Sequence, residues 1–247
     1  MNIVSKIQLT FCFAVFTGTI TNAQNLVRNP GFESYSVCPT NVFEIKYCQD
    51  WWRPPLTNSP DYFNNCQDTN TSVVVNTPAN FAGYQEPKEG SAYMGIICFS
   101  SCVAAYQEYI QSALTTELKP NTVYELTLYV SLADSSKYYA PQIQFCFSKS
   151  ARLKAKKQTG YTVLTCKSCL TENSADLLSN TADWQEIKLQ FTATGGEKYL
   201  TIGNFHNKTN KKLFKKRKQE NILNAASTRD YAYYYLDAIS LIEVYNP

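Results

Sequence analysis

The sequence feature that most constrains the fold is an alternation at residues 123–130, where every second side chain is apolar or aromatic. Successive side chains of a β-strand point to opposite faces, so this pattern predicts a strand with one apolar face. Residues 184–192 repeat the pattern, and Gly195 and Gly196 separate them from a further apolar segment at 199–205. We therefore predict a hairpin that joins these two segments through the glycine pair.

Other strand candidates are short and are separated by turn residues. They lie at residues 72–75, 92–97, 106–111, 143–147 and 233–244. No stretch shows a long helical period with capping residues. Many short strands are typical of a sandwich, so we predict an all-β jelly roll at residues 24–247, folded as one domain. Residues 39–70 alternate little and are predicted to form a long ordered loop pinned by cysteines.

Residues 1–23 have the features of a secretory signal peptide. Lys6 precedes an apolar run at residues 7–20, and small and polar residues follow as far as Ala23. The apolar run is too short to span a membrane comfortably, and no second such run follows. We expect no transmembrane segment and an exported protein, located in the periplasm, at the outer membrane or outside the cell.

Eight of the nine cysteines remain once the leader, with Cys12, is removed. An even number of cysteines in an exported chain favours disulfides, although their connectivity cannot be read from the sequence. Two close pairs, Cys98 with Cys102 and Cys166 with Cys169, could alternatively supply four thiolates to zinc, or form short local disulfides. An oxidising compartment favours disulfides over thiolate ligands.

Two stretches at the ends of the mature chain carry a family resemblance. "NLVRNPGFE" near the start and "YYYLDAISL" near the end together resemble the galactose-binding-like jelly rolls, which include several carbohydrate-binding module families. In that group the first and last strands pair, and a structural calcium often lies where they meet. The resemblance implies that Glu33 and Asp237 contribute carboxylate oxygens to such a site. The family often carries a second aspartate where this chain has Ala238. The alternative is that Glu33 is a turn or edge-strand residue and that Asp237 caps a local hydrogen-bond network.

A second resemblance extends across residues 25–245. Blocks such as "DYFNNC", "GYQEPKEGSAYMGI", "YVSLADSSKY" and "FTATGGEKYLTIGNF" are similar, in this order, to an exported β-sandwich domain of Bacteroidota. That domain commonly precedes an OmpA-like or sorting domain in cell-envelope proteins. The resemblance implies an envelope role. The turn at residues 29–31 would then bring the first strand beside the last and close the sandwich.

The sequence offers little for catalysis. The single histidine, His206, has no Gly-x-Ser-x-Gly nucleophile turn to accompany it, and the chain has neither a phosphate-binding glycine loop nor a His-Glu-x-x-His helix. We therefore expect no enzyme. A glycosidase needs only two facing acids, so an envelope hydrolase stays as a third class of function.

Sugar binding needs flat aromatic faces with amides or carboxylates nearby. The 18 tyrosines and 3 tryptophans supply candidates in turn-rich or strand-end contexts. We predict a carbohydrate site among Trp51, Trp52, Tyr84, Tyr138 and Tyr139. Asp134 and Gln85 are candidate polar neighbours. The alternative for each ring is ordinary packing in the core or at its rim.

Basic residues gather in two places. Arg152, Lys154, Lys156 and Lys157 follow one strand, and residues 208–230 are predicted to be a basic, partly disordered loop insert. An anionic polymer, such as lipopolysaccharide or an acidic glycan, is a candidate partner of the insert. Its cations are Lys211, Lys212, Lys215, Lys216, Arg217 and Lys218. The alternative is a solvated loop, and no nucleic acid is expected behind a secretory leader.

These patterns together favour a non-catalytic, exported cell-envelope binding module that recognises a glycan. The alternative function is a structural or adhesive envelope protein that binds another protein and has no sugar site. An exposed row of aromatic rings flanked by amides would favour sugar, whereas a broad apolar patch would favour protein.

Overall fold

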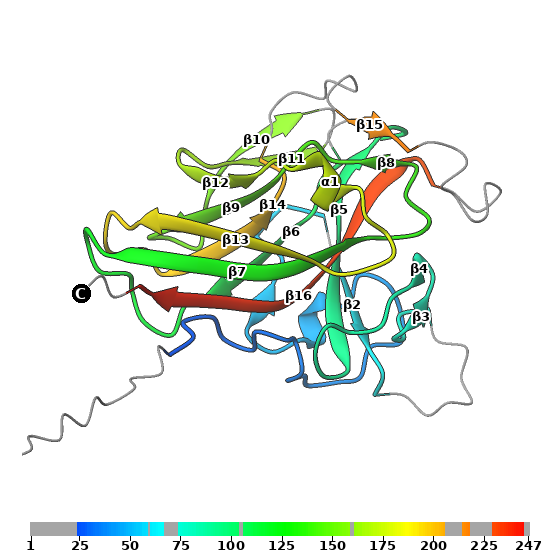
Figure 1. Ribbon diagram of the computed structural model, residues 1–247, viewed down its shortest axis with the longest axis horizontal. Helices are drawn as coiled ribbons and strands as arrows, with labels where there is room; N and C mark the ends of the chain where they lie inside the picture. Colours follow the sequence, from blue (N-terminus) through cyan, green and yellow to red (C-terminus); the bar gives the residue numbers. More distant parts are fainter. Residues whose placement is uncertain are drawn as a thin grey trace, which may run out of the picture.

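The computed structural model describes residues 24–58, 60–66, 74–103, 106–158, 161–205, 214–217 and 229–244. The predicted leader lies outside these residues, so the division into a leader and one domain stays a prediction. Two five-stranded antiparallel sheets form the structure (Figure 1). The front sheet has the order β13 (Gln185–Thr192), β7 (Val123–Leu132), β16 (Tyr231–Glu243), β5 (Ala92–Ser100) and β2 (Asp61–Asn64).

The back sheet lies behind the first (Figure 1). Its order is β1 (Trp51–Trp52), β6 (Tyr109–Ala113), β14 (Tyr199–Gly203), β9 (Ile143–Ser148) and β12 (Cys169–Glu172). Three small strand pairs flank the sheets: β3 (Ala79–Asn80) with β4 (Gly83–Tyr84), β10 (Lys154–Gln158) with β11 (Tyr161–Thr165), and β8 (Tyr138–Tyr139) with β15 (Lys215–Lys216). Two short helices complete the described elements: η1 (Ile45–Tyr47) and α1 (Ala175–Leu178). The prediction of an all-β jelly-roll sandwich is confirmed.

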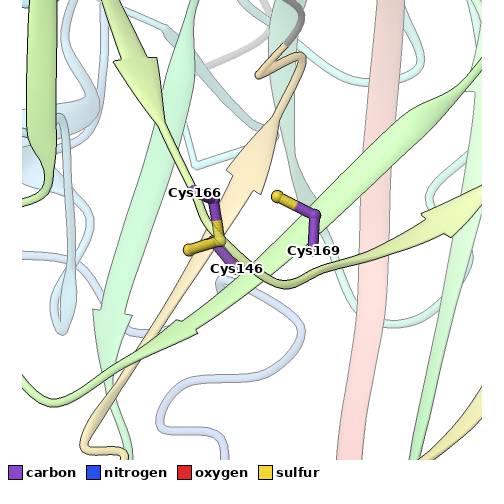
Figure 2. A group of neighbouring side chains, drawn as sticks. All are labelled: Cys146, Cys166 and Cys169. Carbon is purple, nitrogen blue, oxygen red and sulfur yellow. A yellow bond between two sulfur atoms is a disulfide. The ribbon is translucent and has the colours of Figure 1, made fainter.

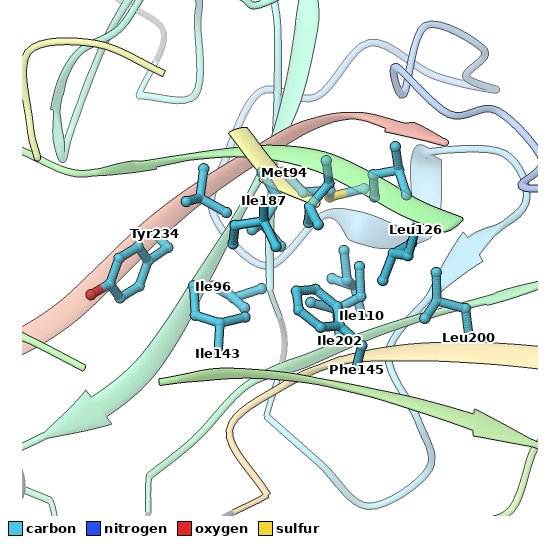
Figure 3. Packing of buried hydrophobic residues seen from close by; sticks show 14 of the residues in the cluster. Met94, Ile96, Ile110, Leu126, Ile143, Phe145, Ile187, Leu200, Ile202 and Tyr234 are labelled. Atoms are coloured by element: carbon cyan, nitrogen blue, oxygen red, sulfur yellow. The ribbon is translucent and has the colours of Figure 1, made fainter. Parts of the chain in front are cut away.

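The core lies between the two sheets and follows from the alternation in the sequence. Every second residue of β7, from Tyr124 to Leu132, is buried against the back sheet. Figure 3 shows this layer: Met94 and Ile187 of the front sheet approach Phe145 and Ile202 of the back sheet. Full burial of each such side chain contributes roughly 1.5–3 kcal/mol, so this interface is the main source of stability.

Most predicted strands are confirmed. The segments at 92–97, 123–130, 143–147, 184–192, 199–205 and 233–244 correspond to β5, β7, β9, β13, β14 and β16. The candidate at 106–111 begins later, because β6 starts at Tyr109. Val74 and Val75 form a turn, so the predicted strand there is wrong where the structure describes it. The predicted long loop at 39–70 contains β1, β2 and η1.

The predicted hairpin at Gly195 and Gly196 is wrong. β13 pairs with β7 in the front sheet, whereas β14 pairs with β6 and β9 in the back sheet. The glycine pair instead carries the chain from one sheet to the other. Gly195 has φ of 91°, and a Cβ there would lie 2.7 Å from Pro120 Cβ. Glycine is required by both the backbone conformation and the close approach.

The N-terminal segment and the last strand lie side by side, as the first resemblance implies. The Leu26 amide donates to the Leu241 carbonyl oxygen at 2.8 Å, and the Ile239 amide donates to the Pro30 carbonyl oxygen at 3.0 Å. The Phe32 amide closes the predicted turn by donating to the Asn29 carbonyl oxygen. Ile239 and Leu241 lie beyond Leu236, where the pairing of β16 with β5 ends, so the N-terminal segment supplies hydrogen-bond partners that β5 does not.

Two disulfides, Cys38–Cys66 and Cys146–Cys166, are present. The prediction of disulfides is confirmed for these pairs, and Cys48, Cys98, Cys102 and Cys169 are free thiols. The four-thiolate zinc alternative is wrong, because Cys166 is oxidised and Cys98 is enclosed in the core.

The described part of the basic insert is ordered. Lys215 and Lys216 form β15, which pairs with β8. Arg217 is 9% exposed, and its guanidinium donates to the carbonyl oxygens of Asp134 and Ser136, both at 3.0 Å. The assignment of Arg217 to an anionic partner is therefore corrected: its guanidinium binds backbone carbonyl oxygens of the same chain. Lys211, Lys212, Lys218 and His206 lie outside the described residues.

Candidate functional site

Trp51, the first of the predicted sugar-binding residues, belongs to the core. It is 2% exposed, its indole N–H donates to the Asn29 carbonyl oxygen at 2.9 Å, and its ring packs against Phe32 with centroids 5.0 Å apart. A ring enclosed in this way presents no face to a ligand. Trp51 instead anchors the turn at residues 29–32 to the sandwich.

The other four predicted rings lie in three separate places. Trp52 lies at the β1 edge of the back sheet, where its indole N–H donates to Gln111 Oε1 at 3.0 Å. Tyr138 and Tyr139 are half-buried on β8, and the ring of Tyr138 meets Phe99 edge-on. Tyr84 is 58% exposed on β4. The structure therefore does not bring these rings together into one binding surface.

The two predicted polar neighbours hold the hairpin that carries Tyr84. Asp134 Oδ2 accepts a hydrogen bond from the Tyr84 amide at 2.9 Å. Gln85 is buried, and its Oε1 accepts a hydrogen bond from the Ser131 hydroxyl at 2.6 Å. Both groups are therefore already used to fix the β3–β4 hairpin to the end of the front sheet.

Glu33 and Asp237 bind the same loop through backbone amides. Glu33 Oε1 accepts from the amides of Ser91 and Ala92, at 2.9 and 3.0 Å. Asp237 is fully buried, and its Oδ2 accepts from the amides of Lys88 and Glu89. Burial raises the pKa of Asp237 to about 8, although the amide hydrogen bonds oppose the shift by favouring the charged form.

These amide hydrogen bonds explain the positions of both carboxylates without a bound ion. Calcium takes roughly six to eight oxygen ligands, and several of these oxygens usually come from carboxylates. Among the residues that the structure describes, neither Glu33 nor Asp237 belongs to a group of three or more side chains placed to hold a metal. The close approach of Glu33 to Gly90, where a Cβ would lie 2.3 Å from the Glu33 carboxyl carbon, fixes the loop instead. The calcium site stays a prediction.

A layer of tyrosines covers the outer face of the front sheet. Tyr93, Tyr233 and Tyr235 point away from the core and are at most 1% exposed, because the β3–β4 hairpin and its flanking loops cover them. Gly95 lies among these rings, and a Cβ there would stand 2.0 Å from Tyr233 Oη. We call this group the tyrosine layer.

A cavity of about 300 Å³ opens at the edge of the tyrosine layer. Asp61, at the start of β2, and Glu108, just before β6, both line it, and they are 3% and 1% exposed. The remaining lining residues are Asn41, Val42, Phe43, Val74, Phe81, Ile97, Tyr106, Arg229, Tyr231 and Tyr233. Two buried acids therefore share a cavity whose walls are largely aromatic and apolar. We call it the acid cavity.

Each acid is fixed by two hydrogen bonds from the protein. Asp61 accepts from the Phe43 amide at 2.8 Å and from the Tyr233 hydroxyl at 2.7 Å. Glu108 accepts from the Ile97 amide at 2.8 Å and from the Tyr106 hydroxyl at 3.1 Å. A carboxylate oxygen has two lone pairs, so each oxygen retains capacity for a further donor.

Burial dominates the electrostatics of the acid cavity. It raises the pKa of Asp61 to about 6, against the opposing hydrogen bonds from Phe43 and Tyr233. Burial also raises the pKa of Glu108 well above its usual value, and the neighbouring charge of Asp61 adds to the shift. The charge of Arg229 partly opposes the rise in the pKa of Asp61, and its guanidinium lies 5.4 Å from the centre of the Phe81 ring. The cavity thus combines hydrogen-bond acceptors, one cation and aromatic walls.

Sequence reasoning missed both acids. Asp61 lies in "PDYFN" at the start of β2 and Glu108 in "QEYIQ" directly before β6, so each is a single acid followed by two aromatic or apolar residues. That context is the available signal, because an acid next to a buried strand must find donors or remain solvated. Their meeting depends on long-range pairing: the Glu108 amide donates to the Ile97 carbonyl oxygen of β5, while Asp61 is in register with Gly95 of the same strand.

Comparisons with known proteins give likenesses in structure. No family model and no curated protein matches the sequence. A CBM22 xylan-binding domain from Paenibacillus barcinonensis aligns with 87% of this chain and 98% of its own, at 14% identity and a TM-score of 0.39. A protein from Bacteroides thetaiotaomicron that is named for sugar binding aligns with 90% of this chain and all of its own, at 10% identity and a TM-score of 0.40.

A third likeness is to an adhesin. The K3 cleaved adhesin domain of Lys-gingipain from Porphyromonas gingivalis aligns with 87% of this chain and 96% of its own, at 13% identity and a TM-score of 0.38. At such low identities and TM-scores, these likenesses carry no argument about the ligand of this chain. The resemblance to Bacteroidota envelope domains likewise stays a prediction.

The described residues contain no helix that is both long and apolar enough to cross a membrane.

Proposed function

We propose that this chain is a non-catalytic, exported cell-envelope module that binds a glycan, and that the acid cavity holds one sugar unit of it. The observation that carries the proposal is the pairing of two buried carboxylates with aromatic walls in a cavity of about 300 Å³. Export is supported by the leader-like residues 1–23 together with two disulfides, which persist in oxidising compartments.

The chemistry of the cavity suits a sugar. Hydroxyl groups donate to carboxylates, and Asp61 and Glu108 each retain unused lone pairs after accepting from the protein. Arg229 donates to ring or hydroxyl oxygens, while the rings of Phe81 and Tyr106 offer apolar surface to the C–H faces of a pyranose. A few convergent polar groups within an apolar wall are typical of small-ligand sites.

The same two acids also raise the question of hydrolysis. A glycosidase acid must be free to reach the glycosidic oxygen, and its partner must reach a water or the sugar carbon. Asp61 and Glu108 are both almost fully buried, and each is held by a backbone amide and a tyrosine hydroxyl. We therefore propose binding without turnover. Incubation with each bound polysaccharide is expected to release no new reducing ends, and a steady release would favour a hydrolase.

Binding to a panel of bacterial, plant and fungal polysaccharides tests the proposed function. Purified residues 24–247 are expected to bind at least one neutral polysaccharide saturably, at low and at moderate salt. Asp61→Asn retains groups able to bond Phe43 and Tyr233 but removes the charge, so it should weaken binding about tenfold, as expected for a hydrogen bond to a charged acceptor. Thermal melting would confirm that this variant folds.

Tyr84→Ala is the matched control, because Tyr84 is exposed and lies outside the acid cavity. It should bind like the wild type. Loss of binding in Trp52→Ala or Tyr84→Ala, with Asp61→Asn unaffected, would move the site to the rings predicted from sequence. No binding to any polysaccharide would favour the alternative, an adhesive protein with a protein partner.

A second candidate, an anionic polymer, is favoured by a groove of about 510 Å³ beside the back sheet. Lys149, Arg152, Lys154 and Lys167 line it, and none of the four has an ion pair with a described residue. Binding confined to acidic polymers and lost at moderate salt would support this groove, since exposed charges are screened by salt.

A further inference from the structure

Three sulfur atoms gather beside the back sheet, on the wall of the basic groove. The sulfurs of Cys146, Cys166 and Cys169 all lie within 4.8 Å of one another, and Cys146 and Cys166 form a disulfide. Figure 2 shows the Cys169 sulfur directed toward that bond. A free thiol therefore lies within reach of a disulfide in the same chain.

Sheet register places Cys169 as a natural partner of Cys146. The two residues are directly opposite each other on the antiparallel strands β12 and β9. Opposed residues of an antiparallel pair have Cα atoms about 4.5–5.5 Å apart, which falls within the range that a disulfide spans. Cys166 lies on the loop between β11 and β12, so its present bond ties the end of the β10–β11 hairpin to β9.

We propose that these three cysteines form a thiol–disulfide exchange site in which Cys169 competes with Cys166 for Cys146. Cys169 loses its proton to solvent, and its thiolate attacks the Cys146 sulfur. The Cys146–Cys169 bond forms as the Cys146–Cys166 bond breaks, and Cys166 leaves as a thiolate that takes up a proton. One disulfide and one thiol are present before and after, so no external oxidant or reductant is needed.

The groove gives this thiol access and a charged setting. Cys169 is partly exposed, and Lys149, Arg152, Lys154, Lys167 and Glu197 line the same groove. Burial raises the pKa of Cys169 to about 11, and the attacking species in thiol–disulfide exchange is the thiolate. Exchange is therefore slow at neutral pH and faster in mild base.

The exchange would change how the hairpin is held. With Cys166 released, no disulfide joins the β10–β11 hairpin to β9. The hairpin would remain packed through Leu164, which is 2% exposed and whose amide donates to Tyr109 Oη at 3.3 Å. A covalent cover over the back sheet would thus become a non-covalent one.

The experiment follows which cysteine is free. Purified residues 24–247 are held at pH 9 without oxidant, quenched in acid at intervals and alkylated, then reduced, alkylated with a second reagent and mapped by mass spectrometry. At the start we expect the first reagent on Cys169 and not on Cys166. With time, label should appear on Cys166, and the label on Cys169 should fall by the same amount. A Cys166 that stays unlabelled would overturn the proposal, and so would label appearing on Cys146 instead.

Two variants separate the proposed route from others. In Cys169→Ser, Cys166 must stay unlabelled, because the nucleophile is gone; label on Cys166 there would overturn the proposal. Cys102→Ser is the control: it removes an exposed free thiol that does not belong to the three-cysteine group, and it should leave the time course unchanged. In Cys166→Ser treated with oxidised glutathione, a Cys146–Cys169 disulfide should form, and its absence would show that the two sulfurs cannot bond.

Discussion

The outer faces of the two sheets are both covered, but by different means. On the front sheet the tyrosine layer is covered by the β3–β4 hairpin and nearby loops through ring contacts and hydrogen bonds, such as the one from Tyr235 to Asn80 Oδ1 at 2.8 Å. On the back sheet, Gln111, Thr201 and Cys146 lie in one row across β6, β14 and β9. The Cys146–Cys166 disulfide fixes the β10–β11 hairpin to that side.

The two kinds of cover leave different chemical groups beside the two sheets: carboxyl groups at the front sheet and a free thiol at the back sheet. A non-covalent aromatic cover needs polar partners for its buried hydroxyls, and Tyr233 finds one in Asp61. The acid cavity lies at this junction. The covalent cover leaves sulfur chemistry instead, with Cys169 beside the disulfide. The proposed ligand site therefore lies at the cover of the front sheet, and the proposed thiol exchange lies at the cover of the back sheet.

Gly95→Ala should destabilise the tyrosine layer, and it should have the largest effect of the substitutions described here. The added Cβ would stand 2.0 Å from Tyr233 Oη and 2.6 Å from Phe63 Cε2, both of which are fully buried. Overpacking of this kind costs about 3 kcal/mol, so the urea midpoint should fall steeply. Thr127→Ala, on the more exposed side of β7, is the control and should change the midpoint little. Equal midpoints for Gly95→Ala and the wild type would mean that the tyrosine layer is not tightly packed.

The stability of the front sheet should depend on pH through Asp237. Because burial raises the pKa of Asp237 to about 8, the folded state holds its proton more tightly than the unfolded chain does. Its contribution is therefore complete below the unfolded pKa of about 4 and is lost as pH rises through about 8. We expect the free energy of unfolding to fall by roughly 3–4 kcal/mol between pH 5 and pH 8. Asp237→Asn should give a flatter dependence, and an unchanged slope would show that other groups control it.

Tyr233→Phe sharpens the link between the tyrosine layer and the acid cavity. It removes the hydroxyl that donates to Asp61 at 2.7 Å and leaves a buried acid with one donor fewer. The loss should be about 1–2 kcal/mol, and the pKa of Asp61 should rise further, because that hydrogen bond favours the charged form. Tyr235→Phe, whose hydroxyl bonds Asn80 instead, is the matched control and should leave the Asp61 pKa unchanged. Carbon-detected NMR titration of the Asp61 carboxyl group measures its pKa in each variant, and urea unfolding measures the loss of stability.

Glu33→Ala should have a smaller effect and also tests the calcium prediction. The amides of Ser91 and Ala92 would lose their acceptor, which costs about 1 kcal/mol at an exposed site. If calcium is bound there, EDTA should lower the melting temperature of the wild type but not that of the variant. If the carboxylate only holds the loop, EDTA should leave both proteins unchanged, and the variant should still melt lower.

The sequence predicted the sandwich better than its sites. Strand alternation is a local property, so β7 and β13 could be located, and the end motifs indicated that the N-terminal segment joins β16. Whether strands share a sheet depends on long-range packing, and the predicted hairpin at Gly195 and Gly196 was therefore wrong. Exposure of a ring also depends on what covers it: Trp51 is enclosed, whereas its neighbour Trp52 is only half-buried.

The acids of the cavity show the same limit. Asp61 and Glu108 are 47 positions apart in the sequence. They meet because both contact β5: Asp61 pairs with Gly95, and the Glu108 amide donates to the Ile97 carbonyl oxygen. No local pattern encodes that meeting. Conversely, Glu33 and Asp237 were brought to one loop as the resemblance implies, yet their described contacts are with backbone amides.

We propose above that the acid cavity holds the ligand. The most direct test is an amide NMR titration of residues 24–247 with a fragment of whichever polysaccharide binds. The amides of Phe43 and Ile97 donate to Asp61 and Glu108, so they report on the two acids. We predict that their signals move most and saturate together, while the Tyr84 amide stays still. Shifts concentrated at Tyr84, at Tyr138 and Tyr139, or along Lys154–Gln158, with Phe43 and Ile97 unmoved, would place the ligand outside the acid cavity.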